Sequence, residues 1–231
     1  MTKIKAPFFE IGPKSYLYGD DVLALALAAD KASEKYGVDI IFTCPVVEIR
    51  RVAEATKHIH VFAPHMDPIP VGRGTADTLA EALVAAGAEG TQLNHVEKPL
   101  SFEVLAETIK RAEEVGLTTI VCADSEEEAA KIATLNPDII VAEPAALIGT
   151  GVSVGPEYVE AATKCVKDVN PDILVLTAAG IAGGEDVYNT IIAGADATGS
   201  SSGVAKAADR AAMVDEMIAA CRKAWDERHA K

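Results

Sequence analysis

The sequence alternates, at nearly regular intervals, between short apolar runs rich in β-branched residues and longer stretches with helical periodicity. Two of the runs, 138–142 and 172–177, are apolar at almost every position, which is typical of strands buried on both faces of a parallel sheet. Strand–helix alternation predicts parallel strands joined by right-handed crossovers. The predicted strands are residues 7–11, 38–43, 59–63, 89–93, 117–123, 138–142, 172–177 and 195–199.

Eight strand–helix units can either close into a barrel or lie in an open, doubly wound sheet. No GxGxxG motif follows the first predicted strand, which argues against the dinucleotide-binding form of the open sheet. No linker and no low-complexity segment interrupts the alternation. We therefore predict a single (β/α)8 TIM barrel, formed as one domain by residues 1–231.

Helix boundaries are marked by capping residues. The first predicted helix opens on the acidic pair 20–21 and closes at Gly37, and another begins at Ser101 and closes at Gly116. The longest predicted helix runs from about Ala205 to Arg228. These boundaries place the loops that follow the strands, where the functional residues of such a barrel are expected.

Composition excludes several classes of function. The 231 residues carry a formal net charge of −14, which argues against nucleic acid as a partner, although local cations can still bind a small anion. No apolar run is long enough to span a membrane, and the N-terminus shows no signal peptide. The four cysteines are widely spaced, without CxxC, which predicts neither a zinc site nor a disulfide framework and favours a reducing cytoplasm.

Three polar residues follow different predicted strands. They are Lys14, His95 and Glu143, a cation, a hydrogen-bonding imidazole and a carboxylate. The active site of a (β/α)8 barrel lies at the carboxyl ends of its strands, so these groups are expected to meet there. Together they suit proton transfer next to a carbonyl group.

Glycine- and serine-rich turns follow the last two strands, at 178–184 and 198–203, where they can present backbone N–H groups to a phosphate. Each feature also has an ordinary structural explanation. The histidine can satisfy a local hydrogen bond, the glutamate can form a salt bridge, and the serines can form a flexible turn. The joint pattern, spread over several strand ends, favours a functional site.

Several stretches together resemble the triosephosphate isomerase family, and its short archaeal type in particular. The similarity covers nearly the whole chain in the same order. The matching stretches are PKSY (13–16), VFAPHMDPIPVGRGT (61–75), GAEGTQLNHVEK (87–98), VAEPAALIGTG (141–151), AAGIAGGEDV (178–187) and GSSSGVAKA (199–207).

The resemblance implies an aldose–ketose isomerase of glycolysis that interconverts glyceraldehyde 3-phosphate and dihydroxyacetone phosphate. Glu143 would abstract and return the proton, neutral His95 would polarise the carbonyl and move protons between the oxygens, and Lys14 would balance the negative charge. Glu97 would hold Lys14, with Gly12 and Asn94 in supporting positions. No metal and no organic cofactor is implied.

The resemblance also implies a mobile lid hinged near Pro144 and closing through Ile148, Gly149, Thr150 and Gly151, which would exclude water. Backbone N–H groups around Ile148, Gly149, Gly180, Ser201, Ser202 and Gly203 would hold the phosphate. The loop 65–77 would dock into a partner subunit, with Thr75 near the neighbouring active site. A homodimer or a homotetramer is therefore expected.

Three positions depart from the family pattern. Gly12 stands where the family has a substrate-contacting asparagine, Pro13 precedes the lysine, and Val96 replaces a small residue after the histidine. The loss of a polar contact suggests a different substrate. The alternatives are an isomerase of a four-carbon sugar phosphate such as an erythrulose phosphate, a non-catalytic sugar-phosphate-binding paralogue, and an aldolase using Lys14 as a Schiff base.

Overall fold

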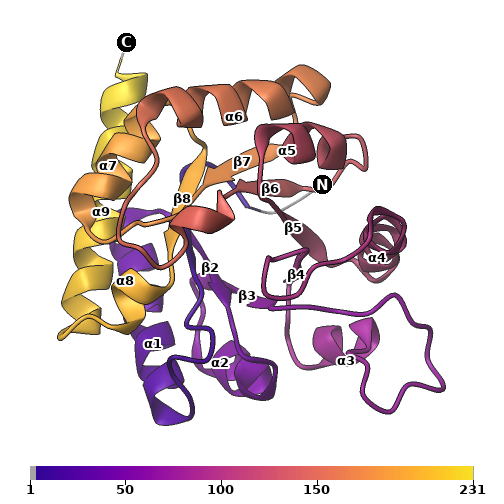
Figure 1. Cartoon of the computed structure of the whole chain (residues 1–231). Helices are drawn as coiled ribbons and strands as arrows, with labels where there is room; N and C mark the ends of the chain where they lie inside the picture. The colour runs from indigo at the N-terminus through magenta and orange to yellow at the C-terminus, as the bar shows by residue number, and fades with distance from the viewer. Residues whose placement is uncertain (1–3, 231) are drawn as a thin grey trace.

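A computed structural model describes residues 4–230. Within this range, eight parallel strands close into a barrel in chain order, from β1 to β8, and the helices surround it (Figure 1). The predicted (β/α)8 barrel is thus confirmed. The strands are β1 (Phe8–Ile11), β2 (Asp39–Thr43), β3 (Ile59–Ala63), β4 (Gly90–Leu93), β5 (Thr118–Ala123), β6 (Ile139–Ala142), β7 (Leu174–Thr177) and β8 (Ala197–Ser200).

The strands lie where the apolar runs predicted them, with ends that differ by at most a few residues. The barrel closes through β1 and β8, where Phe8 is in register with Ala197 and Glu10 with Gly199. The α-helices are α1 (Asp20–Tyr36), α2 (Ile49–Ala55), α3 (Ala80–Ala85), α4 (Phe102–Val115), α5 (Glu126–Ala133), α6 (Pro156–Val169), α7 (Gly184–Ile192), α8 (Ser202–Ala205) and α9 (Arg210–His229).

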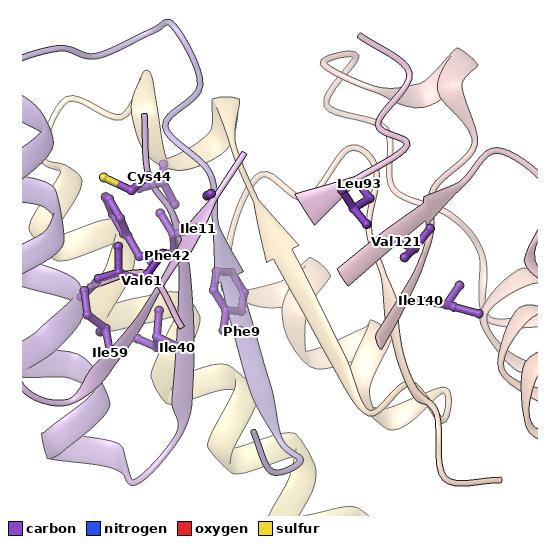
Figure 2. Close-up of a cluster of buried hydrophobic side chains, with 14 of the residues drawn as sticks. Phe9, Ile11, Ile40, Phe42, Cys44, Ile59, Val61, Leu93, Val121 and Ile140 are labelled. Atoms are coloured by element: carbon purple, nitrogen blue, oxygen red, sulfur yellow. The ribbon is translucent and has the colours of Figure 1, made fainter. Parts of the chain in front are cut away.

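Two layers of apolar side chains hold the barrel together, because successive residues of a strand point to opposite faces. One set fills the inside of the barrel and includes Phe8, Ile41 and Phe62. The other set points outward and packs against the helices; Phe9 and Phe42 belong to it (Figure 2). This alternation decides which residues of each strand face the interior.

Capping residues begin and end the helices as the sequence predicts. The Ser101 hydroxyl accepts a hydrogen bond from the Val104 amide at 3.3 Å, and Gly116 ends α4 in the left-handed conformation. Gly37 ends α1 in the same way. Gly37 and Gly116 thus end helices directly before β2 and β5.

The last helix differs from the prediction. The stretch from Ala205 to Arg228 is not one helix, because the short α8 ends at Ala205 and α9 begins at Arg210. The Asp209 side chain accepts a hydrogen bond from the Ala212 amide at 3.0 Å and so starts α9. Among the described residues, none of the helices combines the length and the apolar character that crossing a membrane requires.

Candidate active site

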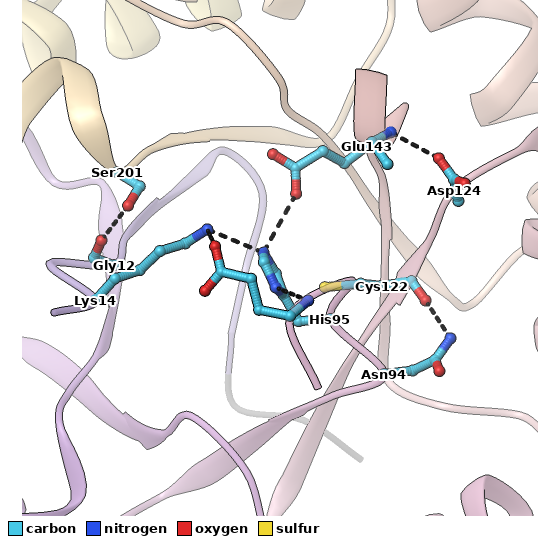
Figure 3. Close-up of polar contacts among 10 residues, drawn as sticks. Gly12, Lys14, Asn94, His95, Cys122, Asp124, Glu143 and Ser201 are labelled. Carbon is cyan, nitrogen blue, oxygen red and sulfur yellow. Dashed lines mark hydrogen bonds and ion pairs between the residues drawn. The ribbon is translucent and has the colours of Figure 1, made fainter. Parts of the chain in front are cut away.

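A cavity of about 730 Å³ opens at the carboxyl ends of the strands. Lys14, His95 and Glu143 all line it, although they follow β1, β4 and β6. Figure 3 shows the three side chains directed toward one another. The structure therefore brings together the three groups that the sequence suggested for proton transfer.

Lys14 follows β1 in a left-handed backbone conformation, with a φ of 47°, which is uncommon for a residue with a side chain. Its Nζ lies 3.0 Å from Glu97 Oε1 and 3.1 Å from His95 Nε2 (Figure 3). The Glu97 carboxylate thus fixes the lysine beside the imidazole. Strained backbone of this kind is often retained where it positions a functional group.

His95 is held as a neutral imidazole. Its Nδ1 accepts a hydrogen bond from the Glu97 amide at 3.1 Å, which places the proton of the neutral ring on Nε2. In this tautomer the approach of the Lys14 ammonium to Nε2 is a close contact between two donors, not a hydrogen bond, and it leaves the Nε2–H group to a ligand. Burial, and then the positive charge of Lys14, lowers the pKa of His95, while Glu97 opposes this effect. The ring therefore presents an Nε2–H group, rather than an imidazolium, to the cavity.

Glu143 follows β6, and its Oε2 lies 4.0 Å from His95 Nε2. Burial raises the pKa of Glu143 above its usual range, while the nearby Lys14 opposes the rise and Glu97 adds to it. A carboxylate with a raised pKa is a stronger base than an ordinary surface carboxylate. The cavity thus holds a base, a neutral proton donor and a cation within reach of one small ligand.

The turns after β7 and β8 line the other side of the cavity. Ala179 and Gly180 have positive φ values of 94° and 72°. The Ser201 hydroxyl donates a hydrogen bond to the Gly12 carbonyl at 2.6 Å, which ties the end of β8 to the turn after β1 (Figure 3). Helix α8 begins at Ser202, so its first amides have no acceptor within the helix.

The segment after Glu143 covers part of the cavity. It starts with Pro144 and the short 3-10 helix η2 (Ala145–Leu147), and its residues Ile148, Gly149, Thr150 and Gly151 line the cavity. The Ala145 amide donates a hydrogen bond to Asp124 Oδ1 at 2.6 Å, which anchors the beginning of the segment to the end of β5. Pro144 itself does not line the cavity.

Comparisons with known proteins agree with this geometry. A family model described as triosephosphate isomerase matches residues 14–220. The chain belongs to the triosephosphate isomerase family. The resemblance seen in the sequence motifs is thereby confirmed.

Relatives named triosephosphate isomerase come mostly from archaea. The protein of Methanothermus fervidus is 38% identical over 203 residues, which cover 87% of this chain and 91% of the relative. The protein of Sulfolobus acidocaldarius is 35% identical over 229 residues, which cover 97% of this chain and 99% of the relative. The protein of Saccharolobus solfataricus is 35% identical over 225 residues, which cover 96% of this chain and 99% of the relative. These comparisons give no support to a four-carbon substrate, a non-catalytic paralogue or an aldolase.

Most of the residues that the family motifs suggested line the cavity. These are Gly12, Lys14, His95, Glu97, Glu143, Ile148, Gly149, Thr150, Gly151, Gly180, Ser201, Ser202 and Gly203. Asn94 does not. Its side-chain amide donates to the Cys122 carbonyl at 3.0 Å and accepts from the Leu100 amide at 3.0 Å, so it shapes the loop that carries His95.

Sequence reasoning on the family motifs missed several cavity residues. Lys206 lies within one of the quoted motifs, one residue after α8, and adds a cation to the cavity. Glu10, Thr43 and Gln92 lie on the strands themselves and face the cavity from the barrel interior. The period of two in each strand was the signal that could have found them. Among the described residues, no cluster of His, Cys, Asp or Glu could hold a metal ion.

Proposed function

We propose that this chain is a triosephosphate isomerase that interconverts glyceraldehyde 3-phosphate and dihydroxyacetone phosphate. The arrangement of Glu143, His95 and Lys14 carries the proposal. His95 Nε2 lies 4.0 Å from the Glu143 carboxylate and 3.1 Å from Lys14 Nζ in a single cavity. Membership of the triosephosphate isomerase family supports the same activity.

The reaction needs two proton transfers in each half. Glu143 takes the proton from the carbon next to the carbonyl, and the His95 Nε2–H group gives a proton to the carbonyl oxygen, which forms an enediol. In the second half, the imidazolate left by this transfer takes the proton of the other hydroxyl at Nε2, and Glu143 returns its proton to the neighbouring carbon. Lys14 stabilises the negative charge that develops on the oxygens. The protonation of both residues is restored at the end.

The remaining parts of the cavity hold the phosphate and exclude water. Backbone N–H groups at Gly149, Gly180 and 201–203 bind the phosphate, because glycine-rich turns and the start of a helix present backbone amides to an anion. Closure of the segment from Ile148 to Gly151 shields the enediol from water. Lys14 and Lys206 balance the charge of the substrate.

The test is steady-state turnover of both triose phosphates by the purified chain. Glu143→Asp shortens the base by one methylene, so we expect kcat to fall roughly 100-fold or more with little change in inhibition by inorganic phosphate. The matched control is Glu107→Asp, the same shortening of an exposed carboxylate on α4. Absence of triose phosphate turnover by the wild-type chain would overturn the proposal.

We further propose that the chain forms a homodimer or homotetramer through the loop 65–77. Large apolar side chains are exposed on the loops after the first strands, at the same end of the barrel, with Tyr18 exposed by 85% and Val47 by 90%. The ends of the loop 65–77 are tied together, because the Asp67 amide donates to the Thr78 carbonyl at 3.0 Å. The loop extends away from the barrel beside α3 (Figure 1).

The cytoplasm is the proposed location. All four cysteines are free thiols, and three of them are buried, as expected of a protein that folds in a reducing compartment. The substrates of the proposed reaction are small phosphorylated sugars.

A further inference from the structure

Glu10 places a carboxyl group inside the barrel. It lies on β1, two residues after Phe8, which belongs to the apolar cluster of the barrel interior. Its side chain lines the same cavity as Glu143 and Lys14. An acidic residue in the interior of a parallel barrel is unusual, because transfer of a carboxylate out of water is costly unless the group is paired.

The Glu10 side chain occupies the space beside two glycines, Gly12 directly after β1 and Gly199 on the neighbouring strand β8. A Cβ atom added at Gly12 would lie 2.9 Å from Glu10 Oε1, and one added at Gly199 would lie 3.1 Å from Oε2. Both positions are therefore too close to the carboxyl for an unshifted side chain. Gly12, which departs from the family pattern, is thus not an empty position, since Glu10 fills the space beside it.

One polar side chain, Thr43 at the end of β2, lies beside the carboxyl of Glu10. The Thr43 hydroxyl lies near enough to lower the pKa of Glu10, but the two groups do not form a hydrogen bond of regular geometry among the described residues. Thr43 Oγ1 is itself buried without a partner in that part of the chain. Buried polar groups normally have partners, so the unpartnered Thr43 hydroxyl beside the Glu10 carboxyl, both lining the cavity, points to a ligand that completes this group.

We propose that Glu10 is a substrate-contacting residue, whose carboxyl hydrogen-bonds an oxygen of the bound sugar phosphate from inside the barrel. The ligand is a small phosphorylated hydroxy-carbonyl compound, and the contact is made to its hydroxyl or carbonyl end rather than to the phosphate. This inference rests on the proposed isomerase function. It assigns to residue 10 a polar contact that Gly12 cannot make.

The charged groups around Glu10 determine its protonation state. Glu143, at the end of β6, raises the pKa of Glu10, and Lys14, after β1, lowers it; the Cys122 thiol of β5 also interacts with Glu10. Burial is the largest effect and raises the pKa of Glu10 to about 7. Two carboxylates in one cavity ionise separately, because each ionisation opposes the other. In this proposal Glu143 is the ionised base, and Glu10 binds in its neutral form, with its O–H group donating a hydrogen bond to the substrate oxygen.

Two substitutions test this contact. Glu10→Gln keeps the shape and a hydrogen-bond donor but does not titrate, whereas Glu10→Ala removes the contact. We expect Glu10→Ala to lower kcat/KM for glyceraldehyde 3-phosphate about tenfold at pH 6, as for one lost hydrogen bond, and Glu10→Gln to lower it only slightly. Glu107→Gln on α4 is the control for the same replacement at an exposed position outside the cavity.

The pH dependence separates a contact from a structural effect. The ratio of wild-type to Glu10→Gln kcat/KM cancels the ionisations that both proteins share. With a pKa of about 7 for Glu10, this ratio falls about tenfold between pH 6 and pH 8 if only the neutral carboxyl binds. A ratio that does not change with pH overturns the assignment of Glu10 as a neutral donor.

Binding of glycerol 3-phosphate, measured by calorimetry against inorganic phosphate, keeps this inference distinct from the proposed function. We expect Glu10→Ala to weaken glycerol 3-phosphate about tenfold and to leave inorganic phosphate unchanged. Equal affinities of wild type and both variants for glycerol 3-phosphate, with unchanged kcat/KM, overturn the contact. If the wild-type chain lacks isomerase activity, the proposed function fails. The effect of Glu10→Ala on the affinity for glycerol 3-phosphate, compared with its effect on the affinity for inorganic phosphate, still decides whether Glu10 contacts the organic part of the ligand.

Discussion

Replacing Gly180 by alanine tests whether the turn after β7 and the covering segment act as one unit. Gly180 has a φ of 72°, and a Cβ atom there would lie 1.9 Å from the Val152 carbonyl oxygen and 2.7 Å from the Ser153 amide nitrogen. Ordinary contact begins at 3.4 Å, so the two backbones must separate by about 1.5 Å. Ser153 cannot simply move away, because its hydroxyl donates a hydrogen bond to Asp186 Oδ1 at 3.0 Å on α7.

We therefore expect Gly180→Ala to disturb catalysis more than stability. A misplacement of about 1 Å in an active site can cost about 100-fold in rate, so kcat/KM should fall by at least about 100-fold. The left-handed backbone alone costs about 1–2 kcal/mol in the free energy of unfolding. Steady-state kinetics with both triose phosphates and urea unfolding measure the two effects separately.

Gly37→Ala is the matched control. Gly37 also has a left-handed φ, of 60°, but nothing lies within 4 Å of an added Cβ, and the residue caps α1 at a distance from the cavity. It should lose about the same 1–2 kcal/mol without loss of kcat/KM. If Gly180→Ala keeps wild-type kcat/KM, the contact between the turn and residues 152–153 does not position the site, and the reasoning is wrong.

Two further predictions concern the substrate charge and the assembly. Lys206→Met removes a cation of the cavity, whose Nζ lies 5.0 Å from the centre of the Tyr16 ring, so KM and the inhibition constant of inorganic phosphate should rise about tenfold while kcat is retained. The control is Lys223→Met, because Lys223 lies 5.2 Å from the Tyr188 ring on the outer helices, and this change should alter neither constant. Equal effects of the two substitutions would contradict the prediction. Light scattering should show a homodimer or homotetramer that Val47→Asp weakens, and a stable wild-type monomer would refute the assembly.

The sequence could predict the fold because the barrel depends on repeated local patterns. Each strand is a short apolar run, and each helix is bounded by residues that cap it, as at Ser101 and Gly116. The stretch after β8 was predicted less well, because its alanine-rich composition fits a helix throughout. The break before Arg210 depends on the Asp209 side chain, whose capping bond is a local feature that the periodicity does not contain.

The site was predictable only where its residues directly follow strands. Lys14, His95 and Glu143 do so, and the closed barrel brings the ends of β1, β4 and β6 to one mouth. Asn94 also follows a strand, but its left-handed φ of 56° accompanies a side chain that bonds within its own loop and to β5. Position after a strand therefore places a residue near the mouth without fixing the direction of its side chain.

Glu10 was not predicted as a site residue because it lies within β1 and does not follow a strand, and the sequence around it is typical of a buried strand. Because the Glu10 side chain points into the cavity, it contributes to the charge of the cavity. The acidic side chains that line the cavity are Glu10, Glu97 and Glu143, and the lysines are Lys14, Lys98 and Lys206. With all of them ionised the cavity would have no net charge, in a chain whose net charge of −14 repels a phosphorylated sugar.

A neutral Glu10 changes this balance. The lysines then outnumber the ionised carboxylates in the cavity, so the site attracts a dianion although the protein as a whole is acidic. Salt screens the distant surface charges over about 8 Å at physiological ionic strength, whereas charges inside the cavity are screened much less. If Glu10 binds as the neutral acid, as proposed above, its protonation provides both a donor for the substrate oxygen and a positively charged cavity for a sugar phosphate, and its ionisation removes both at once.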